Sequence, residues 1–396
     1  MSLSGVRVLV SGAGVAGPAL AWWLGEYGAE VTVVEVAPTL RASGFAIDFR
    51  GPTHFDVLRR MDVLDELTAL QTHGGAMTCV DEDDREVFTL PAEFAGGDLE
   101  IRRADLSRVL YERSLPRAEY LFGDRVTAMA DRPDGVTVDF ARAGTRTFDL
   151  VVGADGLHST VRRLTFGPES DFVRHLDYYI AGWDLPNDRD YKTTPHQYNE
   201  PGRMVSVSAH QHDPQLAGAL TVFASPRLDN DWDDVEGQKK VIQKALSGLG
   251  WHTPHLLAHL DAVDDLYFDS ISRVHAPKWT SARVALLGDA AWGVTLGGMG
   301  VGTAVVGAYV LAGELARTGG DPSALVAYEE LMRPYASKWQ KGANPGKFMA
   351  PATAPGLWFR NKLFNTKAFQ NTLVKATQKF ATSPELPDYP ALLGRA

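Results

Sequence analysis

The sequence predicts an α/β fold that ends in a C-terminal helix, and three features of the 396-residue chain support this prediction. Runs of valine and leucine begin near residues 6, 150 and 284 and lead into helical stretches. Each run ends in glycine or in a glycine–acid pair, as buried parallel strands often do beside a ligand. Between the second and third runs, apolar and polar residues alternate, which is typical of strands with one buried face.

The composition limits the classes of protein to consider. Hydrophobic residues make up 45% of the chain, but no apolar run reaches the roughly 18 residues of a membrane span, and the N-terminus leaves no room for a signal peptide. Cys79 is the only cysteine, which excludes an intramolecular disulfide and a thiolate metal cluster. These features favour a cytoplasmic protein.

The net charge of −10 is unevenly distributed along the chain. Residues 331–384 contain no acidic residue after Glu330 and before Glu385, so this segment is basic while the rest of the chain is acidic. A basic segment docked on an acidic body explains this pattern. Nucleic-acid binding would need a basic patch on the fold itself and is not expected.

The stretch "VRVLVSGAGVAGPALAWWLGEYGAEVTVVE" is typical of a strand, a tight turn, a helix and a second strand. Glycines at G-x-G-x-x-G spacing allow the tight turn, the approach of a pyrophosphate and close helix–strand packing, which together indicate a Rossmann-like unit. The acid at the end of the second strand suits a ribose 2′-hydroxyl and would repel a 2′-phosphate. The candidate cofactor-binding residues here are Gly12, Gly14, Val15, Ala16, Gly17 and Glu35. This motif alone does not separate FAD from NAD.

Two further corners follow buried strands. Leu150–Val152 leads into Asp155-Gly156, with Ser159 and Arg162 at the spacing D-G-x-x-S-x-x-R. Val284–Leu287 leads into Gly288-Asp289 and then into a glycine-rich loop before a helix. Acids at strand ends bind sugar hydroxyls, and glycines bring N–H groups close to a flat or anionic ligand.

In this order, the motifs resemble those of the single-component FAD-dependent aromatic hydroxylases of the para-hydroxybenzoate hydroxylase type, which include the tetracycline-modifying oxygenases. The resemblance covers residues 1 to about 340. It implies that the first motif holds the ADP half of FAD, that Asp289 holds the ribityl chain, and that Asp155-Gly156 serves both FAD and NAD(P)H. It further implies cofactor contacts by Arg41, Arg103, Gly288, Gly298, Met299 and Gly300.

The chain departs from the family pattern after Asp289. Trp292 stands where the family usually has histidine. The loop between Asp289 and Gly298 contains no proline, and it is one residue shorter than in the family. Gly298-Met299-Gly300 replaces a glycine–glutamine–glycine sequence. Because this loop passes the flavin ring in the family, the substitutions bear on ring position or substrate choice.

The resemblance also implies a division into domains. A FAD-binding domain of the glutathione reductase type is expected from residues 1–72, 100–172 and 265–340, and a β-sheet substrate domain from residues 73–99 and 173–264. Residues 341–396 form a linker and a helix, whose predicted apolar face carries Phe359, Leu363, Phe369, Leu373 and Phe380. This helix either closes the two domains together or lies on a membrane surface or partner; the first is favoured.

The implied activity is a monooxygenase that uses NADPH or NADH and O₂ to hydroxylate an aromatic or polycyclic small molecule, such as a polyketide or an antibiotic, through a hydroperoxide at flavin C4a. The alternatives are an oxygenase of the Baeyer–Villiger type, a flavoprotein reductase, and a non-catalytic FAD-binding protein. We expect a monomer or homodimer that binds no nucleic acid.

Because the flavin performs the chemistry, no side chain is required as a catalytic group, and Asp48 is the one candidate. Predicted substrate-pocket residues are Tyr178, Trp183 and Trp292, as large apolar walls, with His210 and His212 expected on one strand face. His252, His255 and His259 have helical spacing, but Pro254 and the lack of a nearby carboxylate pattern lead us to expect no metal site.

Overall fold

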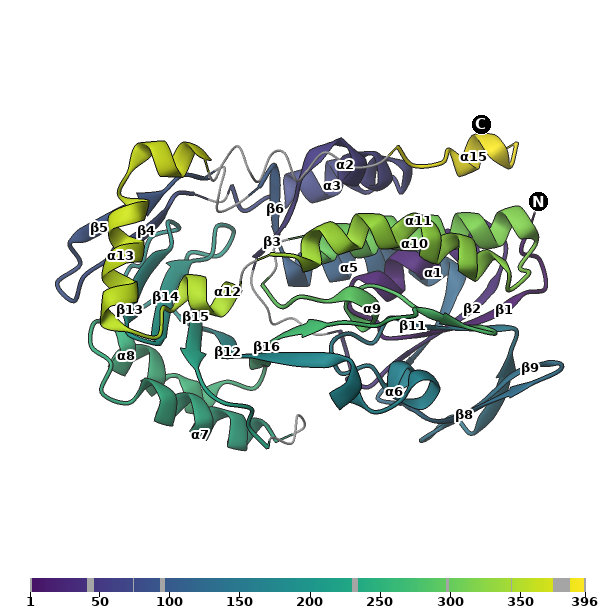
Figure 1. The fold of residues 1–396 in the computed structure, drawn as a ribbon, viewed down its shortest axis with the longest axis horizontal. Helices are drawn as coiled ribbons and strands as arrows, with labels where there is room; N and C mark the ends of the chain where they lie inside the picture. Colours follow the sequence, from purple (N-terminus) through teal and green to yellow (C-terminus); the bar gives the residue numbers. More distant parts are fainter. Residues whose placement is uncertain are drawn as a thin grey trace.

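The computed structural model describes residues 2–40, 46–73, 75–92, 97–229, 234–296, 299–342, 344–372 and 385–394. Within these residues, a six-stranded sheet and a seven-stranded sheet lie end to end along the molecule, and the long strand β12 (Val173–Pro186) runs between them (Figure 1). None of the described helices combines the length and apolar character needed to cross a bilayer.

The six-stranded sheet has the order β17-β18-β11-β1-β2-β7. All neighbours are parallel except β17, which pairs antiparallel with β18 at the edge. The central strands are buried valine and leucine runs, as expected for a parallel sheet covered on both faces. The strands are β1 (Arg7–Ser11), β2 (Glu30–Glu35), β7 (Ala118–Phe122), β11 (Leu150–Gly153), β17 (Thr280–Ser281) and β18 (Val284–Leu286).

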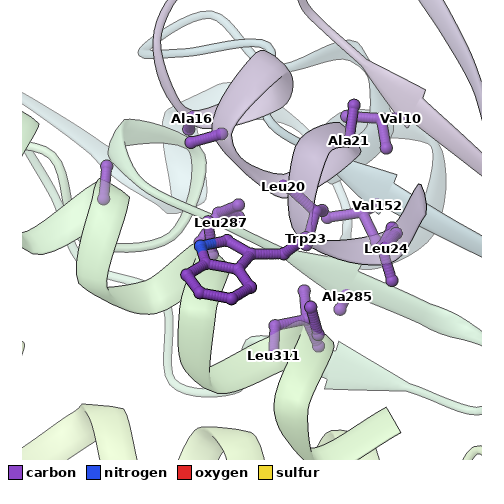
Figure 2. Packing of buried hydrophobic residues seen from close by; sticks show 14 of the residues in the cluster. Val10, Ala16, Leu20, Ala21, Trp23, Leu24, Val152, Ala285, Leu287 and Leu311 are labelled. Carbon is purple, nitrogen blue, oxygen red and sulfur yellow. The ribbon is translucent and has the colours of Figure 1, made fainter. Parts of the chain in front are cut away.

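Helices cover one face of this sheet, and a small antiparallel sheet covers the other (Figure 1). Trp23 of α1 is 2% exposed and packs with Leu287 and Leu311 between sheet and helices (Figure 2). Burying each such leucine contributes about 2 kcal/mol. The helices are α1 (Ala16–Glu26), α5 (Arg103–Ser114), α10 (Gly300–Thr318) and α11 (Ala324–Gln340); the opposite face carries β8 (Val126–Arg132), β9 (Gly135–Phe140), β10 (Thr145–Phe148) and α6 (Thr160–Phe166).

The seven-stranded sheet has the order β16-β12-β15-β14-β13-β4-β5, antiparallel except between β13 and β4. Helices α7 (Val235–Leu246) and α8 (Thr253–Ala258) cover one face, and α12 (Pro345–Met349) packs on the other. Strand β16 pairs with β12 here, although its residues fall in the expected first domain. The strands beside β12 are β4 (Met77–Val80), β5 (Glu86–Leu90), β13 (His196–Glu200), β14 (Arg203–Ala209), β15 (Leu216–Ala224) and β16 (Tyr267–Val274).

These two sheets confirm the predicted fold class, an α/β unit joined to a second β-sheet region. The remaining described elements are short and connect the layers. They are β3 (Ala46–Phe49) paired with β6 (Leu99–Arg102), α2 (Gly51–Arg60), α3 (Leu64–Ala69), η1 (Leu115–Arg117), η2 (Glu169–Asp171), η3 (Leu260–Ala262), α9 (Asp289–Trp292), α13 (Ala354–Phe364) and α15 (Tyr389–Leu392).

The C-terminal segment differs from the predicted helix. Helix α13 ends at Phe364, and Phe359, placed on the predicted apolar face, is 62% exposed. The buried side of α13 is instead formed by Arg360 and Phe364. Arg360 donates hydrogen bonds to the carbonyl of Met349 (2.8 Å) and to Oδ1 of Asn199 (3.0 Å). A buried arginine is invisible to a count of apolar spacings, which explains the error. Leu373 and Phe380 lie outside the described residues.

Candidate active site

The three predicted corners lie together at one edge of the six-stranded sheet. Strands β1, β11 and β18 are adjacent and parallel, so their carboxyl ends meet there. The N–H of Ala154 donates to the carbonyl of Ser11 (2.8 Å), and the N–H of Leu287 donates to that of Gly153 (2.8 Å). A Cβ on Gly12 would lie 2.5 Å from the carbonyl oxygen of Ala154. The first two corners are therefore in backbone contact.

The glycines of the first corner have different roles. A Cβ on Gly17 would lie 1.8 Å from the carbonyl oxygen of Gly12, so Gly17 is required for the turn itself. A Cβ on Gly14 would meet only Nη2 of Arg103, at 4.0 Å, so the space above Gly14 is open. Helix α1 begins at Ala16 with Val15 as its N-cap, and no side chain caps it. Its first N–H groups and open space suit a diphosphate.

Glu35, at the end of β2, braces this corner. Its Oε2 accepts a hydrogen bond from the N–H of Ala13 (2.8 Å), and its Oε1 accepts one from the N–H of Ala37 (2.9 Å). Each carboxylate oxygen retains a second lone pair, which suits a ribose hydroxyl. The structure thus places Glu35 beside the glycine turn, as predicted.

Asp155 makes its hydrogen bonds within the protein. Oδ1 accepts from the Ser159 hydroxyl, and Oδ2 accepts from the Ser11 hydroxyl (3.2 Å) and the N–H of Val161 (3.1 Å). Burial raises the pKa of the Asp155 carboxyl group, and these hydrogen bonds oppose the rise. Asp155 therefore joins β1 to the start of α6, and Gly156, with φ of 76°, lies in the turn from β11 to α6.

Arg162 explains the basic end of the same motif. Its side chain is fully buried, Nη1 donates to the carbonyl of Ala290 (2.9 Å) and Nη2 donates to that of Leu157 (2.6 Å). The arginine of D-G-x-x-S-x-x-R thus ties the second corner to the third, a role the sequence did not predict.

The third corner carries polar groups that are accessible to water but closely surrounded by protein. Asp289 is accessible to water, yet protein surrounds it closely enough that burial raises the pKa of its carboxyl group, against the effect of the Arg103 guanidinium. Tyr267 of β16 is likewise partly accessible, and burial raises the pKa of its hydroxyl. Both groups are therefore open to a ligand, although protein surrounds them closely.

Arg103 lies between the first and third corners. Its guanidinium carbon is 5.9 Å from the centre of the Tyr267 ring, and Nη2 faces the open space above Gly14. Tyr267 was not predicted from the sequence, because only the pairing of β16 with β12 brings it here. The cluster formed by Gly14, Arg103, Tyr267 and Asp289 combines a cation, two hydroxyl-binding groups and an uncapped helix start, which suits a dinucleotide such as FAD.

The loop after Asp289 is only partly described. Gly288 has φ of 65°, and its Cβ position lies 3.4 Å from Cβ of Ala16, so the third corner contacts the start of α1. Gly300 begins α10 with its Cβ position 3.3 Å from Oδ1 of Asp289. Met299 has φ of 150° and is 4% exposed. Gly298 and Arg41 lie outside the described residues.

Trp292 packs in the hydrophobic core. It is 3% exposed, its ring centre is 4.6 Å from that of Trp279, and its Nε1–H donates to the hydroxyl of Thr303 (3.3 Å). These contacts fix Trp292 between α9 and α10. They give no support to its predicted role in the wall of the substrate pocket.

Tyr178 and Trp183, both predicted in one pocket, lie on opposite faces of β12. Tyr178 packs with Ile180 toward α12, whereas Trp183 packs with Tyr179 under α7 and α8. Residues an odd number apart on a strand point to opposite faces. The two side chains cannot line the same pocket, and this parity was readable from the sequence.

His210 and His212 do not lie on a strand face as expected, because β14 ends at Ala209. Nε2 of His210 is 3.0 Å from Oδ1 of Asp184, and Nε2 of His212 is 3.2 Å from the carbonyl oxygen of Gln71. Nδ1 of His210 is buried and, within the described ranges, has no hydrogen-bond partner. His212 is exposed, so the two imidazoles lie in different environments.

Asp48 of β3 forms an ion pair with the Arg50 guanidinium. It does not cap the following helix, because Asp98 accepts from the N–H of Gly51 and His54 accepts from that of Arg50. A role for Asp48 beside the flavin stays a prediction.

Comparison with known proteins decides the family. A model of the FAD-binding domain family matches residues 5–343. A flavin-dependent monooxygenase from an unknown prokaryotic organism is 32% identical over 396 residues, which cover 97% of this chain and 99% of that protein. The chain belongs to the FAD-dependent monooxygenases. The resemblance inferred from its motifs is confirmed.

Two further proteins show how far along the chain the similarity extends. An uncharacterized protein of Mycobacterium tuberculosis is 42% identical over 323 residues, which cover 79% of the monooxygenase and 86% of that protein. The crystal structure of the tetracycline destructase Tet(51) is similar with a TM-score of 0.82 and 29% identity, covering 97% of the monooxygenase and 99% of the other chain. Both similarities extend well beyond the glycine motifs.

Replacing Asp289 by alanine should lower the FAD content of the purified monooxygenase without unfolding it. The side chain is exposed rather than part of the hydrophobic core, so its loss should remove the predicted cofactor contact and leave the packing intact. The ratio of flavin to protein absorbance measures the effect, and circular dichroism checks the fold. Asp264→Ala, at an exposed position before β16, is the matched control. Wild-type occupancy in Asp289→Ala would contradict the assignment.

Proposed function

We propose that this monooxygenase uses NADH or NADPH and O₂ to hydroxylate an aromatic or polycyclic small molecule. The observation that carries the proposal is the cluster of Gly14, Arg103, Tyr267 and Asp289, where elements of both sheets bring a cation, an acid and an open helix start together. Bound FAD supplies a centre that accepts a hydride and activates dioxygen.

We assign the polar residues at this edge to parts of the cofactor. The N–H groups from Gly14 to Gly17 and the Arg103 guanidinium would hold the diphosphate, since an uncapped helix start and a cation both favour anions. The carboxylate of Asp289 would accept from ribityl hydroxyls, and that of Glu35 from a ribose hydroxyl. Asp155 and Arg162 would act indirectly, by fixing the corners relative to one another.

The substrate would lie against the face of β12 that carries Tyr178. Asp184 is on this same face and contacts both His210 and Nη2 of Arg102 (3.1 Å). Arg102 precedes Arg103 in the chain, so these polar residues lie next to the proposed cofactor site. Nδ1 of His210, which has no hydrogen-bond partner among the residues that the structure describes, is a candidate for binding a substrate hydroxyl or carbonyl, and the apolar side chains around Tyr178 exclude water.

The similarity to a tetracycline destructase supports a polycyclic substrate, because the likeness covers both sheets. The altered loop after Asp289 left open an oxygenase of the Baeyer–Villiger type or a reductase. With Trp292 in the core, that substitution no longer favours either alternative.

A test of the proposal begins with the purified protein, which should be yellow and should release FAD on denaturation. Aromatic and polycyclic compounds are then screened for faster NADH or NADPH oxidation under air. A true substrate should yield a product one oxygen atom heavier, with a new hydroxyl group by NMR. A hydrogenated product would indicate a reductase, an inserted ester oxygen a Baeyer–Villiger enzyme, and the absence of FAD would exclude the whole proposal.

A further inference from the structure

The two histidines His255 and His259 lie one helical turn apart at the end of α8. His255 is within the helix, and His259 is both its C-cap and the N-cap of η3. Residues four apart on a helix project from the same side, and their ring centres are 4.9 Å apart. Paired imidazoles at this spacing are common metal ligands when an acid joins them.

The structure supplies the acid that the local sequence lacks. Asp188, in the turn after β12, places Oδ1 3.0 Å from Nε2 of His255 and Oδ2 3.8 Å from Nε2 of His259. One ligand atom from each of the three residues lies within 4.8 Å of the others. Zinc lies about 2.0–2.1 Å from such atoms, which puts tetrahedral ligand atoms about 3.3 Å apart. The observed separations therefore need only small adjustments to hold an ion.

A second observation concerns His255 itself. Its Nε2 is buried and, in the described part of the chain, has no hydrogen-bond partner, although the Asp188 carboxylate is close. The two groups therefore approach each other without the alignment of a hydrogen bond. A lone pair directed between the imidazoles and the carboxylate is the arrangement that a metal ion uses.

We propose that Asp188, His255 and His259 bind a Zn²⁺ ion that fastens the turn after β12 to α8. Two imidazoles and a carboxylate suit zinc, and the half-exposed Asp188 leaves room for water as a further ligand. Figure 1 shows α8 at the end of the seven-stranded sheet remote from α1 and β11. The ion therefore stabilises the second sheet region and takes no part in flavin chemistry.

The test uses the full-length, untagged holoprotein after removal of metals with a chelator. Titration calorimetry with Zn²⁺ should show one ion bound per chain, and Co²⁺ should give the visible absorption bands of a four- or five-coordinate site. Zinc should also raise the melting temperature, because an ion that binds the folded state stabilises it. FAD content should not change, which separates this result from the fate of the proposed activity.

Two variants remove ligands from different elements. His259→Gln and Asp188→Asn should each weaken Zn²⁺ binding by about tenfold or more and abolish the rise in melting temperature. Asp188→Asn is nearly isosteric at an exposed position, so it should fold. His252→Gln is the matched control, because that imidazole precedes α8 but faces Asp84, with Nε2 3.4 Å from Oδ2. It should bind zinc as the wild type does.

The outcomes are decisive in both directions. Loss of binding in both ligand variants, with binding kept in His252→Gln, supports the site. Absence of zinc binding by the wild type, undiminished binding in both ligand variants, or loss of binding in His252→Gln would each overturn it. In the first of these cases, Asp188 and His255 are in contact and bind no ion.

Discussion

Replacing Gly17 by alanine should give a protein that is poorly folded and free of FAD, whereas Gly14→Ala should fold normally and bind FAD weakly. The methyl group that Gly17→Ala adds would lie 1.8 Å from the carbonyl oxygen of Gly12. This oxygen is a backbone atom, so no side-chain rotation can move it away. Opening the turn to relieve this clash should cost about 3 kcal/mol or more.

The methyl group that Gly14→Ala adds would enter open space instead. In the protein without cofactor it would meet only the far end of the Arg103 side chain, at 4.0 Å, so the free energy of unfolding should be unchanged. Its volume would occupy the space through which a pyrophosphate approaches the backbone, and FAD affinity should fall about tenfold or more.

Chemical denaturation of the apoprotein and titration with FAD measure the two effects separately. Gly75→Ala is the matched control, because its Cβ would meet only Oγ1 of Thr194, at 3.7 Å. Equal FAD affinity in Gly14→Ala and wild type would show that the cofactor does not pass over Gly14. An unchanged unfolding energy in Gly17→Ala would contradict the geometry of the turn.

The corners at the edge of the six-stranded sheet could be predicted because their signals are local. Gly12, Gly17 and Gly288 are glycines for reasons that reside in the turn itself, namely backbone contact or positive φ. Parallel pairing of the strands then brings the turns together without further information from side chains. The sequence therefore predicted the three corners that meet at one edge of this sheet.

Side-chain partners that come from distant segments could not be predicted in this way. Arg162 contacts Ala290, Arg360 contacts Asn199, and Asp188 contacts His255. The partners in each pair are far apart in the sequence, so no motif spacing predicts the contact. The error over Tyr178 and Trp183 was of another kind, since the alternation of a strand already separates them. Both residues are large and aromatic, which suggested a shared pocket, but they point to opposite faces of the strand.

His54 shows how a buried, distant pairing creates a property that the sequence does not reveal. The side chain is fully buried in α2, Nδ1 accepts from the N–H of Arg50 (3.1 Å), and Nε2 lies 2.8 Å from the hydroxyl of Tyr335 in α11. Because Nδ1 accepts, Nε2 carries the proton and donates to Tyr335. Burial lowers the pKa of this imidazole to about 4.

His54 should make the protein less stable as the pH falls from 6.5 to about 4. The unfolded chain binds a proton on this imidazole near pH 6.5, whereas the folded chain binds it only near pH 4, so protons favour unfolding within this interval. The separation of about 2.5 pKa units corresponds to a loss of about 3 kcal/mol in the free energy of unfolding. Below the interval both states are protonated, and above it both are neutral, so the contribution is constant on either side.

Denaturation curves of wild type and His54→Gln across this interval isolate the effect, because every other titrating group is common to both proteins. The variant lacks the hydrogen bonds of the ring and should be less stable than wild type at neutral pH, but the gap should shrink as the pH approaches 4. Tyr335→Phe is the control: it removes the hydrogen-bond partner of Nε2 but leaves the imidazole buried, and burial is the cause of the lowered pKa. Its unfolding energy should therefore keep the wild-type dependence on pH. Parallel curves for wild type and His54→Gln would mean that His54 is already protonated, or reached by water, in the folded protein.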